Sequence, residues 1–411
     1  MSQHHQLHND LPGLHRSSLR WLLVYTFFMV IGFSMVIPLV AVHFVSNLGM
    51  ATAIVGIALA VRQVVQQGLT IVGGLLSDKF GIKPMICVGV LVRASGFAVL
   101  ATATDPAGLI LAMILSALGG ALFEAPYQAS IVALTTEKDR AHYYLLSNWV
   151  SGIATALGPL LGIALLQFNF EIVCYVAALC FLANSLIAAA FIPTCRPEAN
   201  RNSSASNLAL VFSDKRFVFF TTFMMGYWFT SVQFNLSFPL WAEKLSTHQE
   251  SVGFMYTMSA AITVVAQYHL VKKLERKFST LQIFLTGLLI MSLTCGAIGF
   301  TTSFPLFLGL VAIYTFGVLM TRPTQQTITA NLANDKALGS YMGFSSLGLA
   351  VGGGLGSWLG GMLIDTARVY QLSALPWVTY CFIGLISTFL LFKLVGKNLT
   401  VNPPPGNTAS A

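Results

Sequence analysis

Long apolar segments, separated by short polar ones, run through almost all of this sequence of 411 residues. Hydrophobic residues make up 55% of the chain and charged residues only 9%, whereas an ordinary soluble domain carries about 25% charged residues. So few charges cannot give a fold of this size a polar surface. The composition therefore excludes soluble, disordered and nucleic-acid-binding proteins.

The apolar segments have the length of membrane spans. A bilayer core of about 30 Å needs roughly 20 apolar residues in a helix. The sequence therefore predicts an all-α membrane protein in a lipid bilayer, with twelve transmembrane helices. The predicted spans are 21–44, 53–76, 84–103, 107–134, 144–166, 172–192, 217–240, 252–270, 281–300, 304–332, 339–364 and 375–395.

The longest interior polar stretch, 193–216, is rich in Asn and Ser and divides the spans six and six. We therefore expect an N-terminal tail over 1–20, a six-helix bundle over 21–192, a linker over 193–216, a second bundle over 217–395 and a C-terminal tail over 396–411. A soluble domain is not expected anywhere in the chain, because no polar segment is long enough.

Lysines and arginines fix the expected orientation, since they concentrate on the cytoplasmic side of membrane proteins. With both termini in the cytoplasm, 17 basic residues lie inside, and Lys244 and Arg368 lie outside. This split predicts a multi-pass protein of a bacterial inner membrane with cytoplasmic tails and linker. Three arginines remain, and they fall within spans: Arg62, Arg93 and Arg322.

The two halves of the chain repeat each other. A shift of 197 residues superposes a set of identical residues and also places Asp78-Lys79 on Glu275-Arg276. The identical pairs are Gly120/Gly317, Leu122/Leu319, Pro126/Pro323, Gln128/Gln325, Ile131/Ile328, Ala133/Ala330 and Tyr144/Tyr341. A same-direction repeat of six helices predicts two pseudo-symmetric bundles and resembles the architecture of the major facilitator superfamily.

Only one of the 14 acidic residues, Glu124, lies deep in a span. A charged side chain at the bilayer centre costs roughly 2.5–3.5 kcal/mol on insertion scales, and such residues mark ion and proton pathways. We therefore expect Glu124 to couple transport to protons. A structural carboxyl held by an arginine is the alternative. Arg322, beside the repeat position of Glu124, is its candidate partner across the two bundles.

Polar side chains in other spans are candidates for the wall of a substrate cavity. Tyr127 and Gln128 follow Glu124 on the same helix face, and Gln325 is the repeat partner of Gln128. Each of these residues is equally compatible with a contact between helices. Further candidates are Arg62, Gln63 and Gln66 in the second span, which form one stripe with Gln67, and Tyr227 and Gln233 in the seventh. Arg93 stands alone in the third span, so we favour a structural role for it.

The loop after the second span resembles the signature loop of the major facilitator superfamily, whose glycine, aspartate and basic residues latch the two bundles together. The matching residues are Gly74, Asp78, Lys79, Gly81 and Lys83. Ile82 departs from the pattern, because a basic residue usually follows the second glycine.

The fifth span resembles the Gly-Pro signature of antiporters in this superfamily through Gly158, Pro159 and Gly162. Proline and glycine let a helix bend and pack closely. The match is partial, since Ala154 and Ile163 stand where the pattern has glycines. The arginine of the fourth span is absent, because Leu115 occupies that position.

Several stretches resemble bacterial proton-linked multidrug exporters of the same superfamily. This resemblance implies proton-coupled antiport that exports amphipathic small molecules by alternating access. It does not fix the substrate. The stretches include Val55 to Leu59 with Arg62 and Gln63, Lys83 to Ile86, Asp214 to Val218, Gly287 to Leu293 and Gly339 to Ser345.

Two other functions remain open. One is a dedicated exporter or importer of an endogenous metabolite such as a siderophore, and the other is a membrane receptor or scaffold. An enzyme and an ATP-driven pump are not expected, because the chain has no G-x-x-x-x-G-K-[ST] phosphate loop. The six cysteines form no C-x-x-C pair, so we expect no metal and no cofactor. The predicted partners are a small-molecule substrate, protons and lipid, and the chain is expected to act as a monomer.

Overall fold

The computed structural model describes residues 12–135, 137–192, 210–246, 251–333 and 338–396. Within these ranges every regular element is helical, which confirms the all-α prediction. The predicted tails and linker lie largely outside the described residues. The first six spans form α2 (Pro12–Ala41) with the π-helix η1 (Val42–Asn47), α3 (Thr52–Phe80), α4 (Ile82–Thr102), α5 (Pro106–Leu134), α6 (Glu137–Leu166) and α7 (Phe170–Phe191).

The second half repeats this order of helices, with its first span in two pieces. Ten helices of the described chain are long and apolar enough to cross a membrane. The two other predicted spans correspond to α9 with α10, and to α11, whose apolar part is Ser251–Ala266. The elements are α9 (Lys215–Ser231), α10 (Gln233–Leu245), α11 (Ser251–Glu275), α12 (Thr280–Ile298), α13 (Phe304–Leu332), α14 (Leu338–Val369) and α15 (Leu375–Gly396).

The predicted span 217–240 consists of two helices, because the helix breaks at Val232. The side-chain amide of Gln233 donates to the Phe229 carbonyl at 3.0 Å, so it occupies the acceptor that the Gln233 backbone would use in an unbroken helix. The same amide nitrogen also donates to the Gly356 carbonyl of α14 at 2.8 Å. The break is therefore tied to packing against another helix.

Polar side chains cap the starts of several helices. Asp105 accepts from the Gly108 amide at the start of α5, and Asn169 from the Ile172 amide at the start of α7. Asp214 accepts from the Phe217 amide at α9, while Ser279 forms a capping box with Gln282 at α12. Each cap satisfies an amide that the helix itself leaves without an acceptor.

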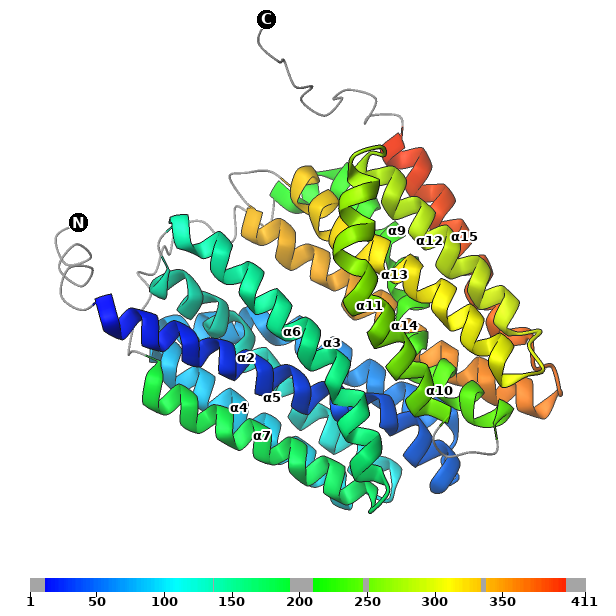
Figure 1. The fold of residues 1–411 in the computed structure, drawn as a ribbon, viewed down its shortest axis with the longest axis horizontal. Coiled ribbons are helices and arrows are strands. Elements are labelled where there is room, and N and C mark those ends of the chain that lie inside the picture. Colours follow the sequence, from blue (N-terminus) through cyan, green and yellow to red (C-terminus); the bar gives the residue numbers. More distant parts are fainter. Residues whose placement is uncertain (1–11, 136, 193–209, 247–250, 334–337, 397–411) are drawn as a thin grey trace, which may run out of the picture.

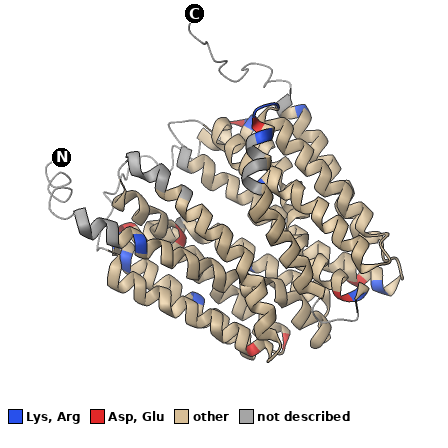
Figure 2. Cartoon of the chain, in the orientation of Figure 1, with Lys and Arg blue, Asp and Glu red and all other residues tan. Residues whose placement is uncertain are grey.

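The helices pack as two groups that the eye can separate in Figure 1. In the N-terminal group α4 packs on α5 and α7, and α2 packs on α6 and α7. In the C-terminal group α12 packs on α13 and α15, and α9 packs on α14 and α15. Each group has its own hydrophobic core. Charged residues gather near the helix ends, and most of the helix length is uncharged (Figure 2).

The two groups touch mainly through α3 with α14 and through α6 with α11. Gly361 lies so close to α3 that a Cβ atom there would stand 2.4 Å from the Thr52 carbonyl oxygen, and Gly56 is equally close to Ser357 of α14. On the other pair of helices, Gly253 lies against Ile163. All of these contacts lie at the end of the molecule opposite to the chain termini, where the groups converge in Figure 1.

The same helix faces are open at the other end. Gly343 lies 14 residues before Ser357 on α14, and Gly152 lies 11 residues before Ile163 on α6. With 3.6 residues per turn, these spacings are close to four and three whole turns, so each pair shares a helix face. A Cβ atom at Gly343 or Gly152 would meet nothing within 4 Å. The two groups are therefore in contact at one end and separated at the end that carries the termini.

Candidate functional site

Glu124 lies half-buried on α5 and contacts the polar stripe of α3. The amide nitrogen of Gln66 donates to its carboxylate at 3.3 Å. Within the described residues, Glu124 and Arg322 form no ion pair, so the predicted contact between the two bundles is absent from this structure. The hydrogen-bond partner of Glu124 comes instead from its own helix group.

The stripe on α3 is joined into one network by Arg62. Its guanidinium donates to the Gln63 side chain at 2.9 Å and to the Gln66 side chain at 3.4 Å. It also lies 5.2 Å from the centre of the Phe33 ring. Gln63 reaches towards the other group, since its Cγ atom lies 3.6 Å from the place of a Cβ atom on Gly353 of α14. Hydrogen bonds therefore connect Glu124 to the α3–α14 contact through three polar side chains.

Arg93 of α4 closes the other side of the site. Its side chain is only 4% exposed, and its guanidinium lies 4.8 Å from the centre of Phe33 and 5.4 Å from Phe123 and Phe181. Such stacking on aromatic faces is attractive, and it is stronger where water is excluded. Arg93 also interacts electrostatically with Glu124. The predicted structural role of Arg93 fits this packing, but the residue also belongs to the charge cluster.

Neighbouring glycines bring these side chains together. A Cβ atom at Gly119 would stand 2.4 Å from the backbone nitrogen of Arg93, so α4 and α5 are in backbone contact there. A Cβ atom at Gly120 would meet the Gln66 amide at 2.9 Å and the Arg93 guanidinium at 3.0 Å. Gly120 therefore leaves room for both side chains one turn before Glu124.

Two further predicted residues follow Glu124 on α5 and have separate partners. The hydroxyl of Tyr127 shares a hydrogen bond of 2.5 Å with Thr26 of α2, and its ring stacks on Tyr25. Gln128 is exposed and accepts a hydrogen bond from Tyr144 at 3.2 Å. The structure therefore brings Tyr127 into contact with α2 and Gln128 into contact with α6.

The predicted residues of the second group are spread out. Arg322 of α13 is exposed, while Gln325 is buried and bonds to Thr329 on its own helix. Tyr227 is 1% exposed among Trp228 and Phe284, so it is part of the hydrophobic core. Gln233 is fully buried at the helix break and also accepts a hydrogen bond from Ser237. In this structure Tyr227 and Gln233 make helix contacts and do not line an open cavity.

The signature loop joins α3 to α4 through Gly81, whose φ of +96° suits glycine. Asp78 and Lys79 are exposed, with the Lys79 ammonium 5.3 Å from the Phe80 ring centre, and Gly74 and Lys83 are half-buried. Ile82, the departure from the family pattern, is 2% exposed within the N-terminal core. A basic side chain could not occupy that position without being buried in apolar surroundings.

The Gly-Pro motif lies at the contact of α6 with α2. A Cβ atom at Gly158 would collide with Ser34, and one at Gly162 would stand 2.3 Å from the Met35 carbonyl oxygen. Ser34 donates to the Ala154 carbonyl at 3.2 Å, and Pro159 lies within the helix. The motif therefore sets the approach of two helices within the first group.

Two residues of these contacts, Phe33 and Asp365, were not predicted from the sequence. Phe33 could not be distinguished from other aromatic residues of an apolar span. Asp365, near the end of α14, accepts hydrogen bonds from the start of α3. A signal for it existed in the sequence, because α3 begins after Ala51, which has no side chain able to cap a helix.

Chemically, the site is one carboxylate among two guanidinium groups and two amides. The Nε atoms of Arg62 and Arg93 are buried and have no hydrogen-bond partner in the structure. The cluster therefore combines one acidic and two basic side chains from α3, α4 and α5. Among the described residues, no group of His, Cys, Asp and Glu has the arrangement of a metal site.

The sequence model of the Major Facilitator Superfamily matches residues 22–272 and 217–410. A "Multidrug resistance protein MdtH" of Photorhabdus laumondii is 39% identical over 365 residues, which cover 89% of this chain and 91% of that protein. The protein of the same name from Yersinia pestis (strain Pestoides F) is also 39% identical, over 87% of this chain and 90% of its own length.

A solved structure with a similar fold is a bacterial homolog of the human lysosomal transporter Spinster. It has a TM-score of 0.77 at 14% identity and covers 96% of this chain and 100% of its own. The predicted twelve-helix fold of two six-helix bundles agrees with this likeness. The chain is a multi-pass membrane transporter that belongs to the major facilitator superfamily.

Proposed function

We propose that the protein is a proton-coupled antiporter that exports amphipathic small molecules, including drugs, across the inner membrane of a bacterium. The observation that carries the proposal is the position of Glu124. It is the one acid deep in a span, and it bonds to a side-chain network that reaches the contact between the two helix groups. The relatives named for multidrug resistance support the substrate class.

Orientation and mechanism follow from the same features. We place both termini, the linker and the tails in the cytoplasm, in accord with the excess of Lys and Arg at that end. The helix groups are separated at the end with the termini, so the structure then corresponds to a state open to the cytoplasm. Alternating access consists of rocking the bundles 21–192 and 217–395 about the site, as in other transporters built from repeats.

Coupling requires that the proton and the substrate exclude each other. With Glu124 ionised, the cluster of Arg62, Arg93 and Glu124 has a net charge of +1, and protonation raises it to +2. A cationic group on the substrate is repelled less by the cluster with an ionised carboxylate than by the protonated cluster. Proton entry from outside therefore favours release of such a substrate, and proton loss to the cytoplasm restores the binding state. A monomer is sufficient for this cycle.

A second candidate function is favoured by the excess of arginine. Two guanidinium groups and one carboxyl suit the carboxylate of an anionic metabolite. Protonation of Glu124 strengthens the attraction for an anion, so the proton and this substrate move in the same direction. The charge of the transported compound thus separates antiport from symport.

The test is flux in inside-out membrane vesicles under an imposed pH gradient, with amphipathic cations and organic anions as substrates. The antiporter proposal expects proton release from the vesicles when a cation is added, and loss of this signal in Glu124→Gln. Glu171→Gln, an exposed acid at the start of α7, is the matched control and keeps full activity. Full coupling in Glu124→Gln would exclude the role of Glu124, and coupling to anions alone would favour the second candidate.

A further inference from the structure

We propose that Asp365 is a positioning residue of the transport cycle, which holds the end opposite to the termini closed by capping α3 from the other helix group. The inference rests on the alternating access proposed above. It concerns the contact between α3 and α14, outside the charge cluster of Glu124.

The start of α3 needs an acceptor from elsewhere. The first amides of a helix have no partner within it, and Ala51 before α3 has no polar side chain. The two oxygen atoms of Asp365 accept one amide each, from Thr52 at 3.1 Å and from Ala53 at 2.8 Å. These residues are more than 300 positions apart, so an N-cap that is normally local is provided by the other group.

Arg368 holds this carboxylate and reaches the same helix start. Its guanidinium lies 3.7 Å from Asp365 and donates to the Thr52 hydroxyl at 3.3 Å. The positive end of the α3 dipole adds to the attraction for the carboxylate. The Asp365 side chain is 27% exposed and that of Arg368 55%, so the carboxylate is the better shielded of the two.

The backbone contacts of α3 with α14 next to the cap explain why the cap forms only when this end of the molecule is closed. Thr52 and Gly361 are in backbone contact, as are Gly56 and Ser357 one turn further along. The hydrogen bonds from α3 to Asp365 can form only while this contact is closed. Rocking of the groups that separates the two helices at this end must break both bonds.

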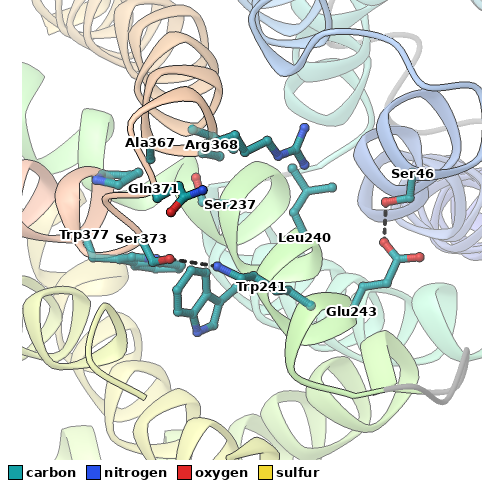
Figure 3. Close-up of a pocket in the computed structure, with 13 residues that line it drawn as sticks. Ser46, Ser237, Leu240, Trp241, Glu243, Ala367, Arg368, Gln371, Ser373 and Trp377 are labelled. Carbon is teal, nitrogen blue, oxygen red and sulfur yellow. Dashed lines mark hydrogen bonds between the residues drawn. The ribbon is translucent and has the colours of Figure 1, made fainter. Parts of the chain in front are cut away.

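Neighbouring side chains show that the surrounding region is only partly filled. Ser46, in η1 of the first group, donates to Glu243 of α10, and Lys244 donates to Ser373 at 3.0 Å. Between them lies a cavity of about 510 Å³ that includes Arg368 and Trp241 (Figure 3). Arg368, the ion-pair partner of Asp365, therefore lines a cavity at this end of the interface.

The geometry of α3 and α14 gives the cap a counterpart. The two helices run antiparallel, because the start of α3 meets the end of α14. Asp78 lies at the opposite end of α3, in the loop that resembles the family latch, and it is exposed here. Each of the two helices thus has an aspartate near its C-terminal end, and among the described residues only Asp365 caps the start of the other helix.

The test is the distance between spin labels at Leu48 and Leu372, two exposed positions at this end that belong to different groups. Labels are introduced after replacement of the native cysteines, in a background that retains transport. We expect Asp365→Ala to lower the ratio of closed to open populations about tenfold, equivalent to about 1.4 kcal/mol. Asp365→Asn, which keeps the shape and one acceptor oxygen, has a smaller effect in the same direction.

Asp105→Asn is the matched control, because Asp105 caps α5 within its own helix group. It should leave the ratio unchanged. An unchanged ratio of closed to open populations in both Asp365 variants would overturn the proposal. If the alanine variant does not fold, the ratio measured for Asp365→Asn is the test by itself. If the wild-type distance stays single in all conditions, alternating access itself fails, and that outcome is distinguishable from a failure of the cap.

Discussion

Two adjacent glycines on α5 should respond in different ways to the same substitution. Gly119 faces the backbone of α4, whereas Gly120 faces the ends of the Gln66 and Arg93 side chains. We predict that Gly119→Ala destabilises the protein and that Gly120→Ala leaves stability almost unchanged but impairs proton-driven transport. Comparing the two variants therefore distinguishes an effect on the stability of the first helix group from an effect on the side chains of the site.

The magnitudes follow from the distances. Ordinary contact of a Cβ atom begins at 3.4 Å, so the 2.4 Å at Gly119 forces two backbones about 1 Å apart. Overpacking of this kind costs about 1–3 kcal/mol, and the better helix propensity of alanine offsets about 1 kcal/mol. The difference is about 0–2 kcal/mol, and we expect a net loss near the upper end, about 2 kcal/mol in the free energy of unfolding, because backbone atoms cannot rotate away.

At Gly120 the shortfall is only about 0.5 Å, since the nearest atom would be at 2.9 Å. The Gln66 and Arg93 side chains can move by that amount. Their movement breaks the bond from Gln66 to Glu124, and a hydrogen bond to a charged group contributes about 1.5–3 kcal/mol. The proton-driven flux should fall about tenfold, which corresponds to about 1.4 kcal/mol.

The assay pairs thermal unfolding of the purified protein in detergent with flux in inside-out vesicles. Gly309→Ala is the control, because a Cβ atom there meets nothing within 4 Å. Equal melting temperatures for the Gly119 variant and the wild type would refute the packing argument. An equal loss of stability in both variants would refute the distinction between backbone and side-chain neighbours.

Three further outcomes are expected. Gly81→Ala lowers the melting temperature, because its φ of +96° costs an L-residue about 1–3 kcal/mol; a variant as stable as the wild type would contradict this conformation. Tyr127→Phe and Thr26→Val each destabilise by about 1 kcal/mol, and the double variant by little more than one alone, as a double-mutant cycle of unfolding would measure. Arg62→Lys keeps the charge but loses the planar contacts to Gln63 and Gln66, so the pH profile of flux should change while the melting temperature stays within about 1 °C.

The fold was predictable from the sequence because the bilayer imposes a length and a polarity on every span. Twelve apolar runs with a repeat between the halves leave few architectures open, and the family likeness agrees. The break at Val232 was not predictable, since it depends on Gln233 finding the Gly356 carbonyl on a helix more than 100 residues away. No local pattern encodes such a partner.

The candidate site was predictable in its centre and not in its contacts. The scarcity of acids identified Glu124, and the spacing of Arg62 and Gln66 identified a stripe. Glu124 and this stripe are in contact because α3, α4 and α5 approach each other closely. Glycines on the buried faces of these helices allow that approach. The position of Tyr227 was not predictable either, because a mixture of aromatic and polar residues is typical of both a cavity wall and a hydrophobic core.

Glu124 is the one acid predicted to lie deep in a span, and this number has a thermodynamic consequence for the proposed antiport. One carboxyl carries one proton per cycle, and one charge moved through 100 mV provides about 2.3 kcal/mol. Since 1.4 kcal/mol corresponds to a factor of ten, a neutral compound can be concentrated about 40-fold for each 100 mV. A monovalent cation exchanged for that proton moves no net charge, so its gradient is limited by the pH difference alone. The number of buried acids therefore sets an upper limit on how steep a gradient the exporter can maintain.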